Sequence, residues 1–183
     1  MTDRTEQNRT EQNRTEQNRT EQNRTEQNRT EQNRTEQNIS LRPATLEDAE
    51  MLLRWRNDEA TRMGSHSTDE VKLEKHIEWL RAALQNQNRQ LYVAEENGVS
   101  VGTVRADYEN GIYELSWTVS PEARGQGVGK RMVGFLASRI KEPIRAEVKK
   151  GNEASSKIAE FSGMKFIKEE SNGVLHYQRN GIE

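Results

Sequence analysis

Seven uninterrupted copies of RTEQN occupy residues 4–38, and none of them contains an apolar side chain. Such a segment cannot contribute to a hydrophobic core, so any compact fold has to be built from residues 39–183. We expect residues 1–38 to be a disordered tail. The three-residue step from each Glu to the next Arg is also compatible with a solvated helix.

Charge and composition exclude several classes of protein. The chain has 28 Lys and Arg against 30 Asp and Glu, so it has no strong field to attract nucleic acid or anionic membranes. It has no cysteine, which excludes disulfides and thiolate zinc sites. The longest apolar run, Leu91 to Ala94, is too short for a membrane span or a signal peptide. We therefore expect a cytoplasmic protein, a monomer or homodimer, with no nucleic-acid or membrane partner.

The first half of residues 39–183 contains clear signals for strands and helices. ISLRP predicts a short strand that ends at Pro43. TLED at 45–48 predicts the start of a helix that ends near Asn57 and Asp58, and STDE at 67–70 predicts the start of a longer one. Residues 90–119 then predict three strands, because the pairs Asn97-Gly98 and Asn110-Gly111 favour tight hairpin turns.

The second half alternates helices and strands. Val128 to Ile140 has helical spacing of apolar residues, IRAEV predicts a strand, and Asn152 is a candidate N-cap for a helix that Gly163 ends. MKFIKEE and VLHYQ predict a final hairpin. The order predicts an α/β or α+β layer with mixed strand pairing, which is neither all-helical nor doubly wound.

The stretch RGQGVGK, Arg124 to Lys130, has the composition of an anion-binding loop. A Walker loop needs Gly where this chain has Arg124 and a hydroxyl where it has Arg131, and the dinucleotide fingerprint needs Gly in place of Lys130. Two interpretations remain: a plain strand-to-helix turn, or a loop whose backbone N–H groups hold an anion at a helix start.

Two motifs carry a resemblance to a known family. RGQGVG resembles the Arg/Gln-x-x-Gly-x-Gly/Ala signature of GCN5-related N-acetyltransferases, through Arg124, Gly127 and Gly129. NEASSKIAEFSGM, Asn152 to Met164, resembles the fourth helix of that family. The resemblance covers about 140 residues. It implies a mixed sheet of about seven strands with helices on both faces, splayed fourth and fifth strands, and acetyl-CoA as cosubstrate without a metal.

The resemblance also implies which residues bind acetyl-CoA. Its pantetheine arm is expected to pair with the backbone of the fourth strand, its pyrophosphate to lie on the glycine loop, and the leading Asn of the fourth helix to contact the arm. In this sequence these residues are Trp117, Thr118, Val119, Arg124, Gly125, Gln126, Gly127, Val128, Gly129, Lys130 and Asn152.

The implied reaction is attack of a neutral primary amine on the thioester, with the oxyanion held by a backbone N–H near Val119. Glu114 is our candidate base, acting through water, and a sheet-edge ion pair is the alternative for this carboxylate. Many family members have a Tyr acid where this chain has Ala159. Water, or a relay through Ser155 or Ser156, is then expected to supply the proton.

Acceptor choice is expected to depend on residues 52–80. LLRWRND and KHIEWL resemble the branch that acetylates nucleotide-linked amino sugars, which makes Arg56, Asn57, His66 and His76 candidate acceptor residues. Arg and His suit a diphosphate, although an exposed helix-end Arg and a structural His are the plainer alternatives. YELSWTVSPEARGQG also resembles the protein N-terminal acetyltransferases, the second candidate. A catalytically silent acetyl-CoA sensor or scaffold is the third.

Overall fold

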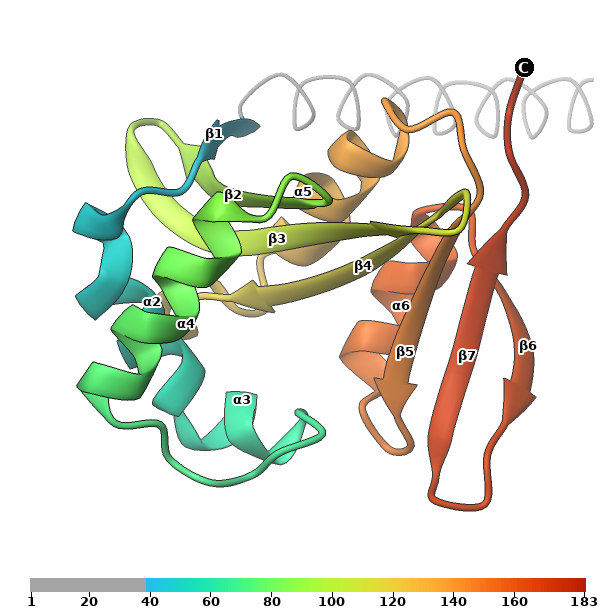
Figure 1. Cartoon of the computed structure of the whole chain (residues 1–183). Coiled ribbons are helices and arrows are strands. Elements are labelled where there is room, and N and C mark those ends of the chain that lie inside the picture. The colour runs from blue at the N-terminus through green and yellow to red at the C-terminus, as the bar shows by residue number, and fades with distance from the viewer. Residues whose placement is uncertain (1–38) are drawn as a thin grey trace, which may run out of the picture. The chain divides into compact units, whose positions relative to one another are not determined.

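The computed structural model describes residues 39–183, and the expected tail lies outside the described residues. A seven-stranded sheet has the order β1-β2-β3-β4-β5-β7-β6 (Figure 1). Its strands are β1 (Ile39–Pro43), β2 (Arg89–Glu96), β3 (Val99–Glu109), β4 (Ile112–Val119), β5 (Ile144–Lys149), β6 (Lys165–Glu169) and β7 (Val174–Arg179). Among the strand pairs of residues 39–183, only β4–β5 is parallel. The predicted mixed α+β sheet is therefore confirmed.

Helices cover both faces of the sheet. The helical elements are η1 (Leu46–Asp48), α2 (Ala49–Asn57), α3 (Glu59–Met63), α4 (Leu73–Gln85), η2 (Pro121–Ala123), α5 (Val128–Ala137) and α6 (Glu153–Phe161). The larger core lies under α5 and α6, where Leu115, Met132 and Ile144 are almost completely buried. A smaller core joins α2 and α4 to β2 through Trp55, Leu80 and other apolar side chains.

The predicted turns and caps are largely confirmed. Asn97 and Asn110 have φ of 51° and 50°, the left-handed conformation that a two-residue hairpin requires. The Asp48 carboxylate accepts the Thr45 N–H at 2.8 Å, which closes the expected capping box.

One predicted boundary is wrong. The helix expected to start at Ser67–Glu70 begins only at Leu73, as α4. The preceding segment is not helical: the Arg56 guanidinium donates to the Ser67 carbonyl at 3.0 Å, and the Asn57 amide exchanges two 2.8 Å hydrogen bonds with the Val71 backbone. The short helix α3 was not predicted.

Candidate active site

The sheet opens between β4 and β5. Their parallel pairing includes only Tyr113 with Ile144 and Glu114 with Arg145, after which the strands diverge (Figure 1). The splay implied by the resemblance is therefore present. Tyr113 donates its N–H to Pro143 on the β5 side, and Ser120 donates to Val101 on the β3 side.

Because N–H groups alternate in direction along a strand, those of Trp117 and Val119 point into the opening. Among residues 39–183, no strand pairs with this part of β4 on that side. The strand therefore presents a row of backbone groups to a ligand that enters the opening. These are the backbone groups that sequence analysis assigned to the pantetheine arm.

The glycine loop lies at the start of α5. Gly125 and Gly127 have φ of +74° and +72°, and a Cβ built on either would meet no atom within 4 Å. Their backbone is thus both left-handed and open, at the N-terminus of a ten-residue helix whose dipole favours an anion. An anion such as a pyrophosphate fits this arrangement.

The third glycine of the loop has a different role. A Cβ on Gly129 would lie 2.4 Å from Ile158 Cδ1 and 3.2 Å from Val119 Cγ2. Gly129 therefore allows α5 to pack closely on α6 and β4. Val128, which is 1% exposed, anchors the same turn in the core.

The polar side chains in and beside the glycine loop form hydrogen bonds and an ion pair that stabilise its conformation. The Gln126 amide donates to the Glu122 carbonyl at 3.3 Å, and Arg131 donates to the Gln126 carbonyl at 3.1 Å while it forms an ion pair with Glu96. The Lys130 ammonium lies 5.7 Å from the centre of the Phe161 ring.

Arg124 connects the loop to α3. Its guanidinium forms an ion pair with Asp58 and donates to the Thr61 hydroxyl at 2.9 Å. The hydrogen bond from Arg124 holds the pKa of Asp58 below its usual range. Asp58 also accepts the Thr61 N–H at 3.1 Å and so caps α3.

The other side of the opening is formed by β5 and α6. Asn152 caps α6 by accepting the Ser155 N–H at 3.2 Å, and its amide nitrogen lies so near Gly64 that a Cβ there would be 2.7 Å away. Lys149 donates to the Met63 carbonyl at 3.1 Å. Because α3 is also bonded to Arg124, this short helix and Gly64 contact both sides of the β4–β5 opening.

The candidate catalytic residues lie at different places. Glu114 lies where β4 and β5 still pair, and its carboxylate accepts a 2.8 Å bond from Arg145. Ser155 is half-buried in the first turn of α6. Ala159, which occupies the position of the family's Tyr, is completely buried.

The four candidate acceptor residues do not form one cluster. Arg56 and Asn57 hold the segment before α4, as described above. His76 is only 4% exposed, stacks on Trp79 and has its pKa lowered by burial. Only the side chain of His66, which is 57% exposed, faces solvent broadly.

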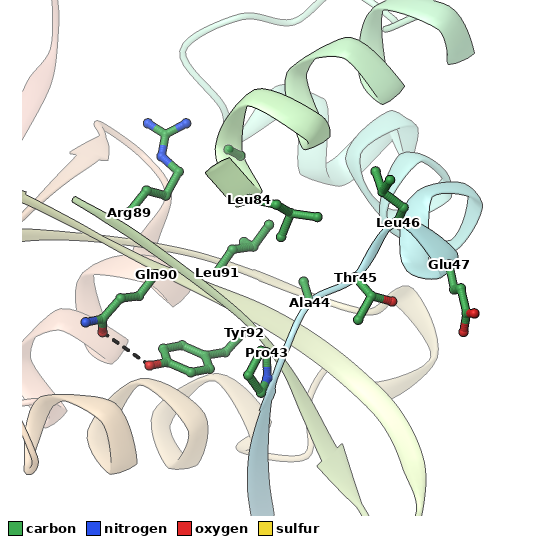
Figure 2. A pocket seen from close by; sticks show the side chains of 11 residues that line it. Pro43, Ala44, Thr45, Leu46, Glu47, Leu84, Arg89, Gln90, Leu91 and Tyr92 are labelled. Carbon is green, nitrogen blue, oxygen red and sulfur yellow. Dashed lines mark hydrogen bonds between the residues drawn. The ribbon is translucent and has the colours of Figure 1, made fainter. Parts of the chain in front are cut away.

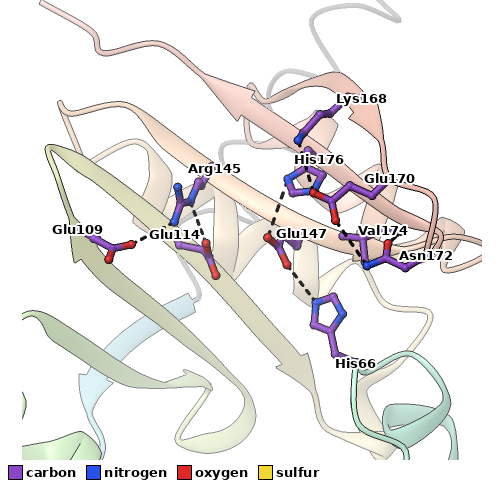
Figure 3. Close-up of polar contacts among 10 residues, drawn as sticks. All are labelled: His66, Glu109, Glu114, Arg145, Glu147, Lys168, Glu170, Asn172, Val174 and His176. Carbon is purple, nitrogen blue, oxygen red and sulfur yellow. Dashed lines mark hydrogen bonds and ion pairs between the residues drawn. The ribbon is translucent and has the colours of Figure 1, made fainter.

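No sequence pattern predicted the cluster of alternating carboxylates and imidazoles beside His66 (Figure 3). Glu147 on β5 lies 3.5 Å from His66 and 3.9 Å from His176, and His176 lies 2.9 Å from Glu170. The alternation in IRAEVK indicates that Glu147 shares a face with Arg145 and Lys149. No local signal places His176 next to it.

A separate open pocket of about 710 Å³ lies between the end of β1, the C-terminus of α4 and the start of β2 (Figure 2). Its lining is mostly apolar, and its Tyr92 hydroxyl and Gln90 amide bond each other at 3.2 Å. None of the candidate site residues lines it. Within residues 39–183, no His, Asp and Glu side chains are grouped to hold a metal, and no described helix is long and apolar enough to cross a membrane.

Comparisons with known proteins give one family match and several similar solved structures. The model of the family described as "Acetyltransferase (GNAT) domain" matches residues 38–165. No protein of curated function matches the sequence. Similar solved structures include a domain from Methanocaldococcus jannaschii, with 23% identity, coverage of 78% of this chain and 97% of that one, and a TM-score of 0.69.

Two further similar structures contain coenzyme A. One is a ribosomal L7/L12 alpha-N-protein acetyltransferase, with 14% identity, coverage of 79% and 94%, and a TM-score of 0.67. The other is an aminoglycoside acetyltransferase, with 16% identity, coverage of 78% and 94%, and a TM-score of 0.65. At these identities the likeness shows a shared fold.

Proposed function

The chain belongs to the acetyltransferase (GNAT) family and is an acetyl-CoA-dependent acetyltransferase, and we propose that its acceptor is the primary amine of a nucleotide-linked amino sugar. The observation that supports amine acetylation at this site is the opening of the sheet beside the glycine loop. We infer that the N–H groups near the end of β4, which pair with no strand of residues 39–183, and the N-terminus of α5 together form one path for a ligand.

Acetyl-CoA fits that path. The open, left-handed backbone at Gly125 and Gly127 suits the pyrophosphate, and the N–H groups of Trp117 and Val119 suit the amides of the pantetheine arm. Arg124 and Asn152, on the two sides of the opening, complete the proposed site. Binding there brings the thioester into the opening, where an amine attacks it.

The proposed chemistry uses few protein groups. The Val119 N–H stabilises the oxyanion, because a fixed backbone donor lowers the energy of developing charge without reorganising. The thiolate takes its proton from water or from Ser155, since the buried Ala159 offers none. A positioned acid contributes roughly 10² to 10⁴ in rate, so the enzyme is expected to be slower than a relative with the Tyr.

His66 is the acceptor candidate with a broadly exposed side chain, and the half-buried Arg56 contacts the segment beside it. Arg56 extends from the end of α2 to Ser67, and His66 lies one residue before that contact, so both groups border the same loop. A guanidinium and an imidazole there suit a diphosphate. His76 contacts a ligand only after α2 and α4 separate, because its ring is buried between them. We therefore propose that His76 has a structural role in the packing of α4 and does not bind the acceptor.

A protein N-terminus is the second candidate acceptor. The segment YELSWTVSPEARGQG resembles that branch, and the fold is shared with an alpha-N-protein acetyltransferase. A peptide acceptor has no diphosphate, so the two proposals differ in their need for Arg56.

The experiment is CoA release, followed with a thiol reagent, from UDP- and CMP-linked 4-amino sugars and from N-terminal peptides. For the amino sugar, Arg56→Ala should raise KM about ten- to a hundredfold, the loss expected for one charged hydrogen bond. The control Arg81→Ala, on the exposed face of α4, should leave KM unchanged. If peptides are acetylated and no amino sugar is, the acceptor is a protein N-terminus and the amino-sugar proposal is wrong. If no amine leads to CoA release, the third candidate, a catalytically silent acetyl-CoA sensor or scaffold, is favoured.

A further inference from the structure

We propose that Glu147, flanked by His66 and His176, receives the ammonium group of the acceptor and takes up its proton before acetyl transfer. The inference rests on the proposed amine acetylation and adds the group that makes the amine nucleophilic. It replaces Glu114 in that role and indicates an acceptor that arrives as a cation.

The first argument is the position of Glu147. Arg145 is the last residue of β5 that pairs with β4, and Glu147 is the next residue on the same face, where the two strands have begun to diverge. Its side chain is 37% exposed and faces the loop after α3, so a ligand reaches it from solvent (Figure 3). Glu114, in contrast, lies at the closed end of the opening.

The second argument is the kind of partner that each carboxylate has. Glu114 has a permanent cation, the Arg145 guanidinium, at 2.8 Å. Glu147 Oε2 lies 3.5 Å from His66 Nε2, and its Oε1 lies 3.9 Å from His176 Nδ1. Among the described residues, these two imidazoles are the ion-pair partners of Glu147.

The cations near Glu147 are directed elsewhere. Lys149 donates to the Met63 carbonyl, Arg145 contacts Glu114 and Glu109, and Lys168 lies 3.4 Å from Glu170. The titratable groups around Glu147 are thus Arg145 and Lys149 on β5, His176 on β7, His66 after α3, Lys168 and Glu170 from the last hairpin, and Glu114 on β4. An incoming ammonium group therefore supplies a cation that can pair with Glu147.

The third argument is chemical. An N–H bond of the ammonium breaks, its electron pair stays on nitrogen, and the proton passes to the Glu147 carboxylate and on to an imidazole. An imidazole nitrogen can accept that proton, and His66 is 57% exposed, so the proton can pass on to solvent. The freed pair attacks the thioester carbon, and the C–S bond breaks with its electrons on the CoA sulfur. The attacking nitrogen then loses its second proton to water, and water or Ser155 protonates the sulfur.

The test uses the three histidines of the chain. Imidazole NMR signals of the full-length protein with acetyl-CoA are followed while glucosamine, a cationic primary amine, is added. We expect saturable shifts of His66 and His176, with the buried His76 as internal reference. N-acetylglucosamine, which lacks the ammonium, should shift none of the three.

Variants identify the carboxylate. Glu147→Gln should abolish the glucosamine response, and Glu160→Gln, on the exposed face of α6, should keep it. Loss of the response in Glu114→Gln but not in Glu147→Gln would overturn the proposal. So would a wild-type protein in which glucosamine shifts neither His66 nor His176.

Kinetics separate this inference from the proposed function. With an amine that releases CoA, Glu147→Gln should lower kcat/KM by roughly 10² to 10⁴, while calorimetric affinity for acetyl-CoA stays unchanged. The loss of kcat/KM in Glu147→Gln should be smaller with hydroxylamine as acceptor, because hydroxylamine is already neutral at the assay pH. Normal turnover by Glu147→Gln refutes the inference and leaves the acetyltransferase intact. CoA release from no amine refutes the proposed function instead.

Discussion

Gly127→Ala is expected to weaken acetyl-CoA binding by a mechanism that a second glycine can isolate. Gly127 has φ +72° and Gly98, in the β2–β3 hairpin, has φ +77°. Around both, a Cβ would meet no atom within 4 Å. The two substitutions therefore impose the same backbone strain without a clash, and only one lies at the proposed pyrophosphate site.

The expected magnitudes follow from that comparison. A side chain in the left-handed region costs about 1 to 2 kcal/mol, offset by about 0.4 to 1 kcal/mol because alanine restricts the unfolded chain. Both variants should thus lose about 1 kcal/mol of folding free energy, or about 4 °C in Tm for a domain of this size. Only Gly127→Ala adds a methyl group where the anion approaches the backbone. We expect it to raise the acetyl-CoA Kd at least tenfold, equivalent to about 1.4 kcal/mol.

Calorimetric titration with acetyl-CoA and thermal melting of both variants measure the two effects separately. Gly98→Ala should bind acetyl-CoA as the wild type does. A folded Gly127→Ala protein with wild-type affinity would refute the placement of the pyrophosphate. Equal weakening in both variants would show that general strain, and not the loop, controls binding.

Three further variants test the architecture around the site. Arg42 hydrogen bonds hold the pKa of Asp48 below its usual range, so this pair stabilises the fold above about pH 4 and less as the pH falls further. Asp48→Asn should cost roughly 1.5 to 3 kcal/mol in urea unfolding at pH 7, and the difference should narrow at pH 3. Burial lowers the pKa of His76, so as the pH falls this imidazole takes up a proton in the unfolded chain before it does so in the folded protein. The free energy of unfolding of the wild type should therefore decrease from pH 7 to pH 5. In His76→Met this decrease should be smaller. Asn57→Ala should remove both hydrogen bonds to Val71, costing about 1 to 3 kcal/mol and increasing amide exchange in the segment before α4.

Local patterns in the sequence were sufficient for most of the elements. Alternation, helical spacing and the pairs Asn97-Gly98 and Asn110-Gly111 predicted all seven strands and four of the helices, because each signal acts within a few residues. The start of α4 was misplaced for the opposite reason. Ser67 to Glu70 has the local pattern of a helix start, but contacts from Arg56 and Asn57, at least ten residues away, bind the backbone of this segment, which is not helical.

The sequence by itself determined that residues 39–183 hold the apolar core, and that the glycine loop joins a strand to a helix. It also carried the family motifs. Only the tertiary structure decided which carboxylates are available for chemistry. Glu114 and Arg145 meet through parallel strands, and Glu147 and His176 meet through an antiparallel register, across chain separations of about 30 residues. Such pairings depend on how whole strands align, and no short sequence pattern encodes the alignment.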